Sequence, residues 1–457
     1  MSGSFFSDLL ATISDRGRQL IERRLEPQAP GERRAAFVIG LAEQLMSRRG
    51  EASGVAIAGE ILSAYKGLKS GPRVAFFGAL AHRFGTVHER LRAALDAYEA
   101  RPDDDTAQGV HYAAEPRRQE LFRRLNLAPG GTPVLVAMRR DLLDVLPRRP
   151  DLGAVDSDLM HLFSSWFNRG FLVVRRIDWT TPAHILEKII RYEAVHEIGS
   201  WDELRRRLEP VDRRCFAFFH PALVDEPLIF VEVALTRDIP AAIAPLLRPD
   251  RPALPVAEAT TAVFYSISNC QEGLKGISFG SFLIKQVAEE LKRELPGLER
   301  FVTLSPVPGF AAWLDGELAA EPRHVAREDR EALRALAEPE WWADPARAES
   351  LRRPLLNAAA AYFLRARDGR GRVIDPVARF HLGNGARLEQ LDHLGDLSPK
   401  GLRQSRGLMV NYLYDLDHIE RNHEAFANQG TVTASSRVQK LARAEPKGTA
   451  AGTAAPA

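Results

Sequence analysis

Residues 261–304 constrain the fold most, because they combine two strand patterns, a helix pattern and a glycine-bearing loop. Side chains alternate in character along Thr261–Ser268, which predicts a strand, and Phe301–Leu304 predicts a second, shorter strand. Between them, one apolar stripe along Ser281–Glu294 predicts a helix that ends before Pro296. If both strands run parallel in one sheet, their crossover is expected to be right-handed. This unit predicts a domain that combines helices with a sheet.

The chain changes character near residue 170. Before this point, apolar residues recur at spacings of three and four, as in Phe5–Arg24 and Val55–Leu68, which predicts amphipathic helices. After it, short apolar runs such as Cys215–Phe219 and Leu228–Leu235 lie between turn residues and predict strands. The expected fold class is therefore α+β, with an all-helical N-terminal bundle followed by a mixed α/β domain.

A chain of 457 residues is long enough for two or three domains. We expect a helical domain for packing or oligomerisation over residues 1–172, and a mixed α/β domain over residues 173–427. Residues 428–457 are rich in Ala, Thr, Gly, Ser and Lys, which predicts a disordered tail.

Charge and cysteine content exclude several classes of function. The formal net charge is only +2, so no overall field attracts nucleic acid or an anionic membrane. Cys215 and Cys270 are the only cysteines, and no Cys/His spacing is typical of zinc, so neither a disulfide scaffold nor a metal is expected. The sequence has no run of 18 apolar residues, so it predicts no membrane span. Without a secretory signal at the start or a peroxisomal signal at the end, the cytoplasm is the expected location.

The loop that follows the first strand contains Gly273, Gly276 and Gly280, just before a predicted helix. Free N–H groups at a helix N-terminus suit a phosphate or pyrophosphate, and glycine permits close approach of the backbone. Lys275 would add a positive charge. A tight turn without any ligand explains the same glycines, so spacing alone leaves both interpretations open.

Ser305 and His381 are two further candidates for a functional site. Ser305 follows the second strand, and ligand crevices in open sheets lie beyond the carboxyl ends of strands. A serine before proline is also a common turn residue. His381 lies in Asp375–Gly385, which predicts a loop leading into a short element, and its apolar neighbours suit a core histidine as well as a catalytic one. The residues alone leave both roles open.

Four segments, taken in their order and spacing, resemble the malonyl-CoA decarboxylase family. The resemblance runs from about Met160 to Tyr414, which is more than half of the chain. The first segment is FYSIS at residues 264–268, followed by Gln271 and by GLKG at 273–276. The second is LSPVPGF at 304–310, and the third is DPVARFHL at 375–382 with NGA at 384–386. The fourth is GLMVNY at 407–412.

The resemblance implies a helical N-terminal domain that makes oligomer contacts and a catalytic domain similar to the GNAT acyltransferases. It implies Ser305 and His381 as catalytic residues, with Asn411 and Tyr412 or Tyr414 as supporting groups. It also implies a loop that cradles the CoA pyrophosphate, formed here by Lys275, Gly276, Ile277, Ser278, Phe279, Gly280 and Ser281.

The activity that the resemblance implies is conversion of malonyl-CoA to acetyl-CoA and carbon dioxide, by a carboxy-lyase of fatty acid metabolism. The thioester carbonyl accepts the electrons as an enolate, so no cofactor or metal is expected. The expected assembly is a homo-oligomer, a dimer or tetramer formed through the helical domain, without nucleic acid or membrane as a partner. A CoA-dependent acyltransferase and a non-catalytic acyl-CoA-binding protein are the alternatives, and the segments around Ser305 and His381 favour the decarboxylase.

Overall fold

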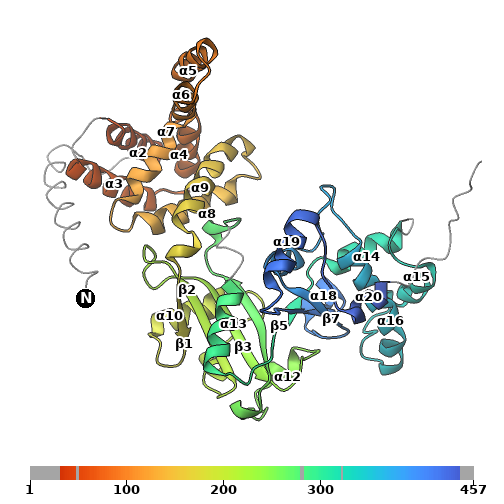
Figure 1. Cartoon of the computed structure of the whole chain (residues 1–457). Coiled ribbons are helices and arrows are strands. Elements are labelled where there is room, and N and C mark those ends of the chain that lie inside the picture. Colours follow the sequence, from red (N-terminus) through yellow and green to blue (C-terminus); the bar gives the residue numbers. More distant parts are fainter. Residues whose placement is uncertain (1–30, 48–50, 278–282, 321–322, 443–457) are drawn as a thin grey trace, which may run out of the picture. The chain divides into compact units, whose positions relative to one another are not determined.

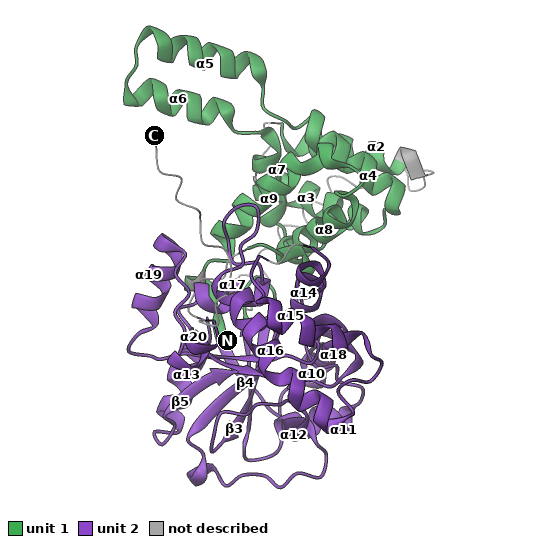
Figure 2. Ribbon diagram, turned by 90° about the vertical axis from the view of Figure 1, so that its right-hand side faces the viewer, with its two compact units in different colours: residues 1–173, 219–226, 271–279 green, residues 174–218, 227–270, 280–457 purple. Residues whose placement is uncertain are grey.

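A computed structural model describes residues 31–47, 51–277, 283–320 and 323–442 of the chain. These residues divide into two units (Figure 2). Unit 1 comprises residues 1–173, 219–226 and 271–279, and unit 2 comprises residues 174–218, 227–270 and 280–457. The main division lies next to the boundary that we expected after residue 172. Two short segments that we expected in the second domain instead pack within unit 1.

Unit 1 is helical in its described part, as predicted. Its helices enclose a core that includes Phe76, Leu121 and Leu135, all fully buried. A buried ion pair, Arg118 with Asp158, joins two of the helices. The predicted helix at Phe5–Arg24 lies outside the described residues. The helices are α2 (Gly31–Leu45), α3 (Glu51–Lys66), α4 (Ser70–His82), α5 (His88–Ala100), α6 (Asp104–Ala114), α7 (Arg117–Asn126), α8 (Gly131–Val145) and α9 (Gly153–Trp166).

Helices α5 and α6 form a hairpin that extends away from the other helices of unit 1 (Figures 1 and 2). Asp103 caps α6 by accepting a hydrogen bond from the Thr106 N–H at 2.9 Å. Helix α5 has no buried residue, and large side chains such as Leu95 and Tyr112 are exposed. The hairpin therefore carries apolar surface that the rest of unit 1 does not cover.

Unit 2 is built on a mixed sheet whose strand order is β1-β2-β3-β4-β5-β8-β6, with β7 paired to β8 (Figure 1). Strands β4 and β5 run parallel, with Phe264 opposite Thr303, whereas β3 and β4 run antiparallel. The strands are β1 (Val173–Ile177), β2 (Arg213–Phe219), β3 (Pro227–Thr236), β4 (Thr261–Asn269), β5 (Arg300–Thr303), β6 (Ser305–Pro306), β7 (Arg387–Asp392) and β8 (Met409–Leu413). The predicted strand–loop–helix–strand unit and the α+β fold class are confirmed.

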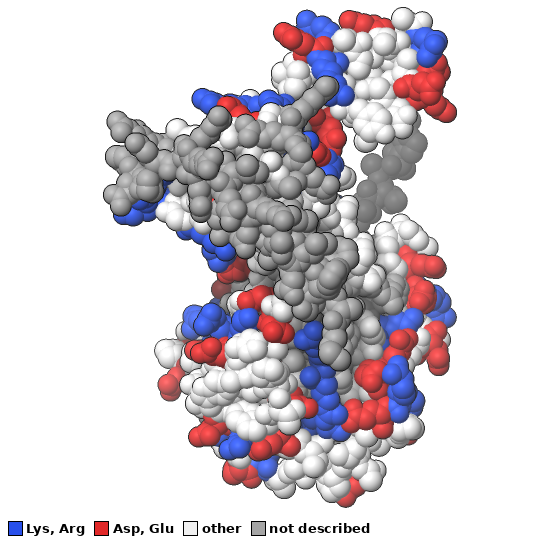
Figure 3. All heavy atoms as spheres, turned by 90° about the vertical axis from the view of Figure 1, so that its left-hand side faces the viewer, with Lys and Arg blue, Asp and Glu red and all other residues white. Residues whose placement is uncertain are grey.

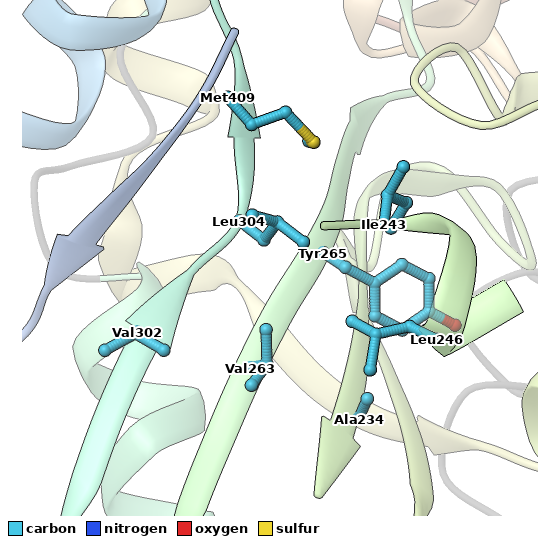
Figure 4. Close-up of a cluster of buried hydrophobic side chains, with 8 residues drawn as sticks. All are labelled: Ala234, Ile243, Leu246, Val263, Tyr265, Val302, Leu304 and Met409. Carbon is cyan, nitrogen blue, oxygen red and sulfur yellow. The ribbon is translucent and has the colours of Figure 1, made fainter. Parts of the chain in front are cut away.

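The helices of unit 2 cluster around this sheet. A buried cluster joins β3, β4, β5 and β8 to a short helix, and in Figure 4 the ring of Tyr265 lies beside Leu246 of that helix. The cluster also includes Leu304, which directly precedes β6. The helices are α10 (Ala183–Tyr192), α11 (Trp201–Leu208), α12 (Ala244–Leu247), α13 (Leu283–Glu294), α14 (Phe310–Ala319), α15 (Arg327–Leu333), α16 (Pro345–Leu364), α17 (Pro376–Gly383), α18 (Pro399–Ser405), α19 (Ile419–Gln429) and α20 (Ser436–Ala442).

Residues 428–442 differ from the disordered tail that we expected there. Helix α19 continues to Gln429, and the Ser435 hydroxyl donates to the Glu389 carbonyl at 2.7 Å. The side chain of Val438 in α20 is fully buried. The segment is ordered because it pairs with the edge of β7 and buries an apolar side chain, whereas the low-complexity composition begins further on. Residues 443–457 lie outside the described residues.

On the face that Figure 3 shows, the described residues carry both signs of charge. Figure 3 shows Lys and Arg side chains interspersed with Asp and Glu side chains wherever the visible face is not grey. None of the described helices is long and apolar enough to span a membrane.

Candidate functional site

Strand β6 and helix α17 bring together two residues that lie 76 positions apart in the sequence. Ser305 begins β6 opposite Val410 of β8, and its Oγ lies 3.2 Å from Nε2 of His381 on α17. Asp375 caps α17 by accepting a hydrogen bond from the Ala378 N–H at 2.8 Å. The predicted loop at Asp375–Gly385 is therefore wrong, because residues 376–383 form a capped helix that holds the histidine.

The imidazole of His381 is fixed on its other sides by two tyrosines at the end of the chain's last strand. Its Nδ1 lies 2.8 Å from the hydroxyl of Tyr414. The ring of Tyr412 stacks on the imidazole, with 4.5 Å between centroids and 24° between planes. A neutral imidazole has one donor and one acceptor nitrogen, so the two hydroxyl partners occupy both. The histidine is thus held in one orientation before any ligand binds.

Burial controls the charge of this histidine. Only 3% of His381 is exposed, and burial lowers the pKa of its imidazole to about 3. Burial also raises the pKa of Tyr412 and of Tyr414. All three groups are therefore neutral at pH 7. Such a site carries no fixed charge and responds strongly to a charge that enters it, because the low dielectric strengthens electrostatic interactions.

Ser305 has a second hydroxyl partner that the sequence analysis missed. Its Oγ donates to Oγ1 of Thr303 at 2.9 Å, and that oxygen also accepts from the Tyr412 N–H at 3.2 Å. Alternation along the chain at residues 303 and 305 would have placed both side chains on one face of the sheet. Asn411 acts elsewhere, because its Nδ2 donates to the carbonyls of Thr303 and Pro240 at 2.8 and 3.2 Å.

The hydroxyl and the imidazole open onto a cavity of about 250 Å³, here called the Ser305–His381 cavity. Its walls are largely apolar side chains of unit 2, and Tyr265 and Asn269 are the other lining residues with a polar side-chain group. Cavities for drug-sized ligands measure roughly 300–1,000 Å³, so this space suits the reacting end of a larger substrate. The lining includes Val195, Phe264, Ile267, Leu304, Pro306, Pro376, Val377 and Phe380.

A buried carboxylate fixes one wall of this cavity. Oε1 of Glu193 accepts hydrogen bonds from the N–H groups of Val195 and His196 at 2.9 and 2.7 Å. The Ser266 hydroxyl on β4 donates to the other carboxylate oxygen at 2.7 Å. Glu193 thereby ties the segment that carries Val195 to the central sheet, which keeps the wall in place.

The described part of the predicted phosphate loop, Lys275, Gly276 and Ile277, belongs to unit 1, and Ser278, Phe279, Gly280 and Ser281 lie outside the described residues. Lys275 and Gly276 are exposed, and Gly276 has a positive φ of 82°. The N–H groups of Lys275 and Ile277 donate to carbonyls within the turn, at 3.0 Å each. Two backbone donors that we expected to face a phosphate are therefore already used.

One arginine of α8 holds this turn within unit 1. Nη1 of Arg139 donates to the carbonyls of Gly273 and Lys275, at 2.8 Å each, while its Nε pairs with Asp156 at 2.7 Å. Arg139 is 1% exposed. A Cβ on Gly273 would lie 1.9 Å from the carbonyl oxygen of Val136. Glycine is thus required at position 273 for close packing against α8, which agrees with the tight-turn interpretation that the sequence left open for this glycine.

Family models match most of the chain. Residues 170–452 match the family described as "Malonyl-CoA decarboxylase C-terminal domain", and residues 84–167 match "Malonyl-CoA decarboxylase N-terminal domain". A curated relative from Anser anser anser, "Malonyl-CoA decarboxylase, mitochondrial", is 36% identical over an alignment of 415 positions that covers 83% of this chain and 82% of the relative. Its counterpart from Rattus norvegicus is 32% identical over an alignment of 476 positions that covers 93% of this chain and 96% of the relative.

Solved structures give the same likeness. The crystal structure of malonyl-CoA decarboxylase from Rhodopseudomonas palustris has a TM-score of 0.86 and 58% sequence identity, over 89% of this chain and 99% of that chain. The crystal structure of malonyl-CoA decarboxylase from Agrobacterium vitis has a TM-score of 0.85 and 59% identity, over the same shares of the two chains.

Proposed function

This chain belongs to the malonyl-CoA decarboxylase family, and we propose that Ser305 and His381 carry out its reaction. As a member of this family it is a carboxy-lyase that converts malonyl-CoA to acetyl-CoA and carbon dioxide. The observation that carries the assignment of residues is the 3.2 Å contact between Ser305 Oγ and His381 Nε2 at the Ser305–His381 cavity.

The reaction consumes one proton, because the malonyl carboxylate leaves as neutral carbon dioxide while the remaining carbon gains a hydrogen. His381 supplies that proton. In the free protein its imidazole is neutral, since burial lowers its pKa to about 3. When the malonyl carboxylate enters the cavity, the adjacent negative charge favours the charged imidazolium, and the histidine takes up a proton from solvent.

The bond to the carboxyl group breaks when it lies across the plane of the thioester carbonyl, so the cavity walls must hold the malonyl group in that orientation. The electrons of that bond move into the carbonyl and leave an enolate. The Ser305 hydroxyl, which donates to Thr303 Oγ1 in the free protein, turns its single hydrogen to the enolate oxygen, while the protonated Nε2 of His381 donates to its Oγ. A donor in such a position contributes about 2.7–4 kcal/mol in comparable sites.

His381 then transfers its proton to the enolate carbon, so that one N–H bond breaks and one C–H bond forms. General acids of this kind contribute about 10²–10⁴-fold to the rate. Tyr414 keeps Nδ1 engaged, which directs Nε2 toward Ser305 and the cavity. The thioester carbonyl is the electron sink, and the step needs no co-reactant other than the proton.

For the substrate's CoA moiety, we propose that residues 275–281 hold the pyrophosphate. The exposed Lys275 side chain supports this assignment, because it offers a positive charge on a turn that Arg139 keeps fixed. The N–H groups of Lys275 and Ile277 already donate within the turn, so the lysine carries the phosphate contact in the described part of the loop.

For the assembly, we propose a homo-oligomer, a dimer or tetramer, that uses the α5–α6 hairpin. The exposed Leu95 and Tyr112 are apolar side chains that a second copy would cover. Light scattering of the purified protein and of a Leu95→Glu variant tests this. We expect the variant to lose mass per particle, whereas a monomeric native protein would overturn the proposal.

For the cellular setting, we propose the cytoplasm and a role in fatty acid metabolism, without nucleic acid or membrane as a partner. Both cysteines, Cys215 and Cys270, are free and buried, which suits a reducing compartment. The two signs of charge are interspersed on the visible surface, which does not favour a polyanionic partner.

The test of the catalytic assignment is an incubation of the purified protein with malonyl-CoA alone, in the presence of EDTA and without any acceptor. We expect stoichiometric acetyl-CoA and carbon dioxide, and loss of both in His381→Asn. Intact malonyl-CoA would point to a binding protein, and turnover only with an added amine would point to an acyltransferase. Full turnover by His381→Asn would overturn the role given to that residue.

A further inference from the structure

Unit 2 contains a second cavity, of about 80 Å³, that shares no lining residue with the Ser305–His381 cavity. It is here called the arginine cavity, because guanidinium groups dominate its charged lining. One carboxylate, Glu203, lines it as well. The five arginines are Arg206 and Arg207 of α11, Arg213 of β2, and Arg248 and Arg251 in the segment that follows α12.

The carboxylates next to three of these arginines are already paired. Arg207 donates to Glu203 at 2.9 Å and to the buried Glu232 at 3.0 Å. Arg251 donates to Asp212 at 2.6 Å, and the same carboxylate accepts from the Leu254 N–H at 2.9 Å. Arg248 pairs with Asp250 at 2.9 Å. These ion pairs leave no carboxylate over for the remaining two arginines.

Arg213 is buried, and no carboxylate oxygen among the described residues lies within hydrogen-bond distance of its guanidinium. It is 3% exposed, and its guanidinium donates to the Leu246 carbonyl at 2.5 Å. The nearest carboxylate oxygen belongs to Asp212, at 4.0 Å, and Arg251 already occupies it. Burial, together with repulsion from Arg251, lowers the pKa of Arg213 despite its acidic neighbours. A buried charge of this kind is costly unless something pairs with it.

Arg206 is exposed at the rim of the same cavity, and no carboxylate among the described residues lies within ion-pair distance of it. Its neighbour Arg205, also exposed, lies outside the lining and pairs with Glu209 at 3.2 Å. The two adjacent arginines therefore differ in access to the cavity and in pairing with a carboxylate, and both differences favour Arg206 as a ligand of an anion in the cavity.

We propose that the arginine cavity binds a phosphate group, held between Arg213 at its base and Arg206 at its rim. Guanidinium groups bind phosphate through paired, charge-assisted hydrogen bonds, which suits a site lined by five arginines. The volume is well below the roughly 300–1,000 Å³ of cavities for drug-sized ligands, so a free phosphate ion or the terminal phosphate of a larger molecule fits, with the rest of that molecule outside.

The experiment measures thermal unfolding of the whole protein as inorganic phosphate is titrated at constant ionic strength. We expect a saturable rise in Tm for the native protein and for Arg205→Gln. In Arg206→Gln the midpoint should move at least about tenfold higher in phosphate, because one of the two guanidinium groups proposed to hold the phosphate is lost. An unsaturable response, or equal midpoints in Arg206→Gln and Arg205→Gln, would overturn the proposal.

A second arm separates this site from the substrate site. Saturating coenzyme A should leave the phosphate midpoint unchanged, and Arg206→Gln should keep the native KM for malonyl-CoA. Competition between coenzyme A and phosphate would place the anion in the substrate site and overturn the inference.

A third arm replaces inorganic phosphate with glycerol phosphate. Tighter binding of the ester identifies a phosphomonoester as the occupant, whereas weaker binding identifies the free ion; either result must be lost in Arg206→Gln.

Discussion

The two regions assigned to the reaction, the Ser305–His381 centre of unit 2 and the Lys275 turn of unit 1, are built in opposite ways. At the centre, side chains from three separate elements contact one another in a buried, neutral environment. At the turn, one buried arginine holds main-chain carbonyls while the lysine side chain stays exposed. The difference teaches that chemistry here depends on preorganised side chains, whereas substrate affinity depends on the path of a short backbone segment. Substitutions in the two regions should therefore separate kcat from KM.

The largest effect is expected at the centre itself. Ser305→Ala removes the donor to the enolate oxygen and His381→Asn removes the proton donor, so each should lower kcat by about 10²–10⁴-fold. KM for malonyl-CoA should change little, because the turn and the cavity walls remain. Steady-state kinetics measures both values, and circular dichroism checks that the variants fold. Near-normal kcat in both variants would remove the distinction between the two regions.

The second effect is expected at the turn. Arg139→Met leaves two carbonyls without their donor and Asp156 without its partner. Breaking such a buried pair costs about 3–5 kcal/mol in stability, and the looser turn should raise KM more than it lowers kcat. Arg140→Gln is the matched control, because this neighbouring arginine is half exposed and contacts neither carbonyl. A fall in kcat without a change in KM would contradict the comparison.

A smaller effect should come from the tyrosine that orients the imidazole. Tyr414→Phe removes the hydroxyl 2.8 Å from Nδ1, and a hydrogen bond of about 0.5–1.5 kcal/mol corresponds to a fall in kcat of up to about tenfold. The pH profile of kcat/KM should shift as well, which a loss of packing alone would not cause. Tyr412→Phe serves as the control, since its hydroxyl has no partner among the described residues while its ring stacks on the imidazole. Equal effects of the two changes would show that orientation by Tyr414 is not important.

The last effect concerns stability in acid, and it is measured as a free energy of unfolding and not as a rate. The pKa of His381 is about 3 in the folded protein and about 6.5 when unfolded, so between these values only the unfolded chain binds the proton. The free energy of unfolding should therefore fall by about 1 kcal/mol per pH unit below pH 6.5, and the loss ends near pH 3. Urea unfolding at pH 7 and pH 5 measures it, with His381→Asn as reference. The variant should lose less stability than the native protein between the two pH values, and parallel losses would contradict the assignment.

The spacing of apolar residues predicted the elements that carry a regular pattern, such as the strand at Thr261–Ser268 with its alternating side chains. Periodicity did not predict helix α17, because its eight residues are too few for a clear periodic pattern. Asp375 followed by Pro376 is nevertheless a recognisable helix start. The roles of Ser305 and His381 came from family resemblance. No local rule predicts a 3.2 Å contact between residues 76 positions apart. The contacts of Thr303 and Arg139 could not be predicted for the same reason, because only the folded chain decides which side chains meet.

The composition of unit 1 from three separate segments has a consequence for how the protein is made. Its first 173 residues leave the ribosome well before residues 219–226 and 271–279, which complete the same unit. At about 5–20 residues per second, a nascent helical unit waits several seconds for the segment that packs Gly273 against Val136. During that interval the surface of α8 is uncovered. Premature termination between the segments should therefore yield a fragment that chaperones retain, even though every helix of unit 1 up to α9 has already been synthesised.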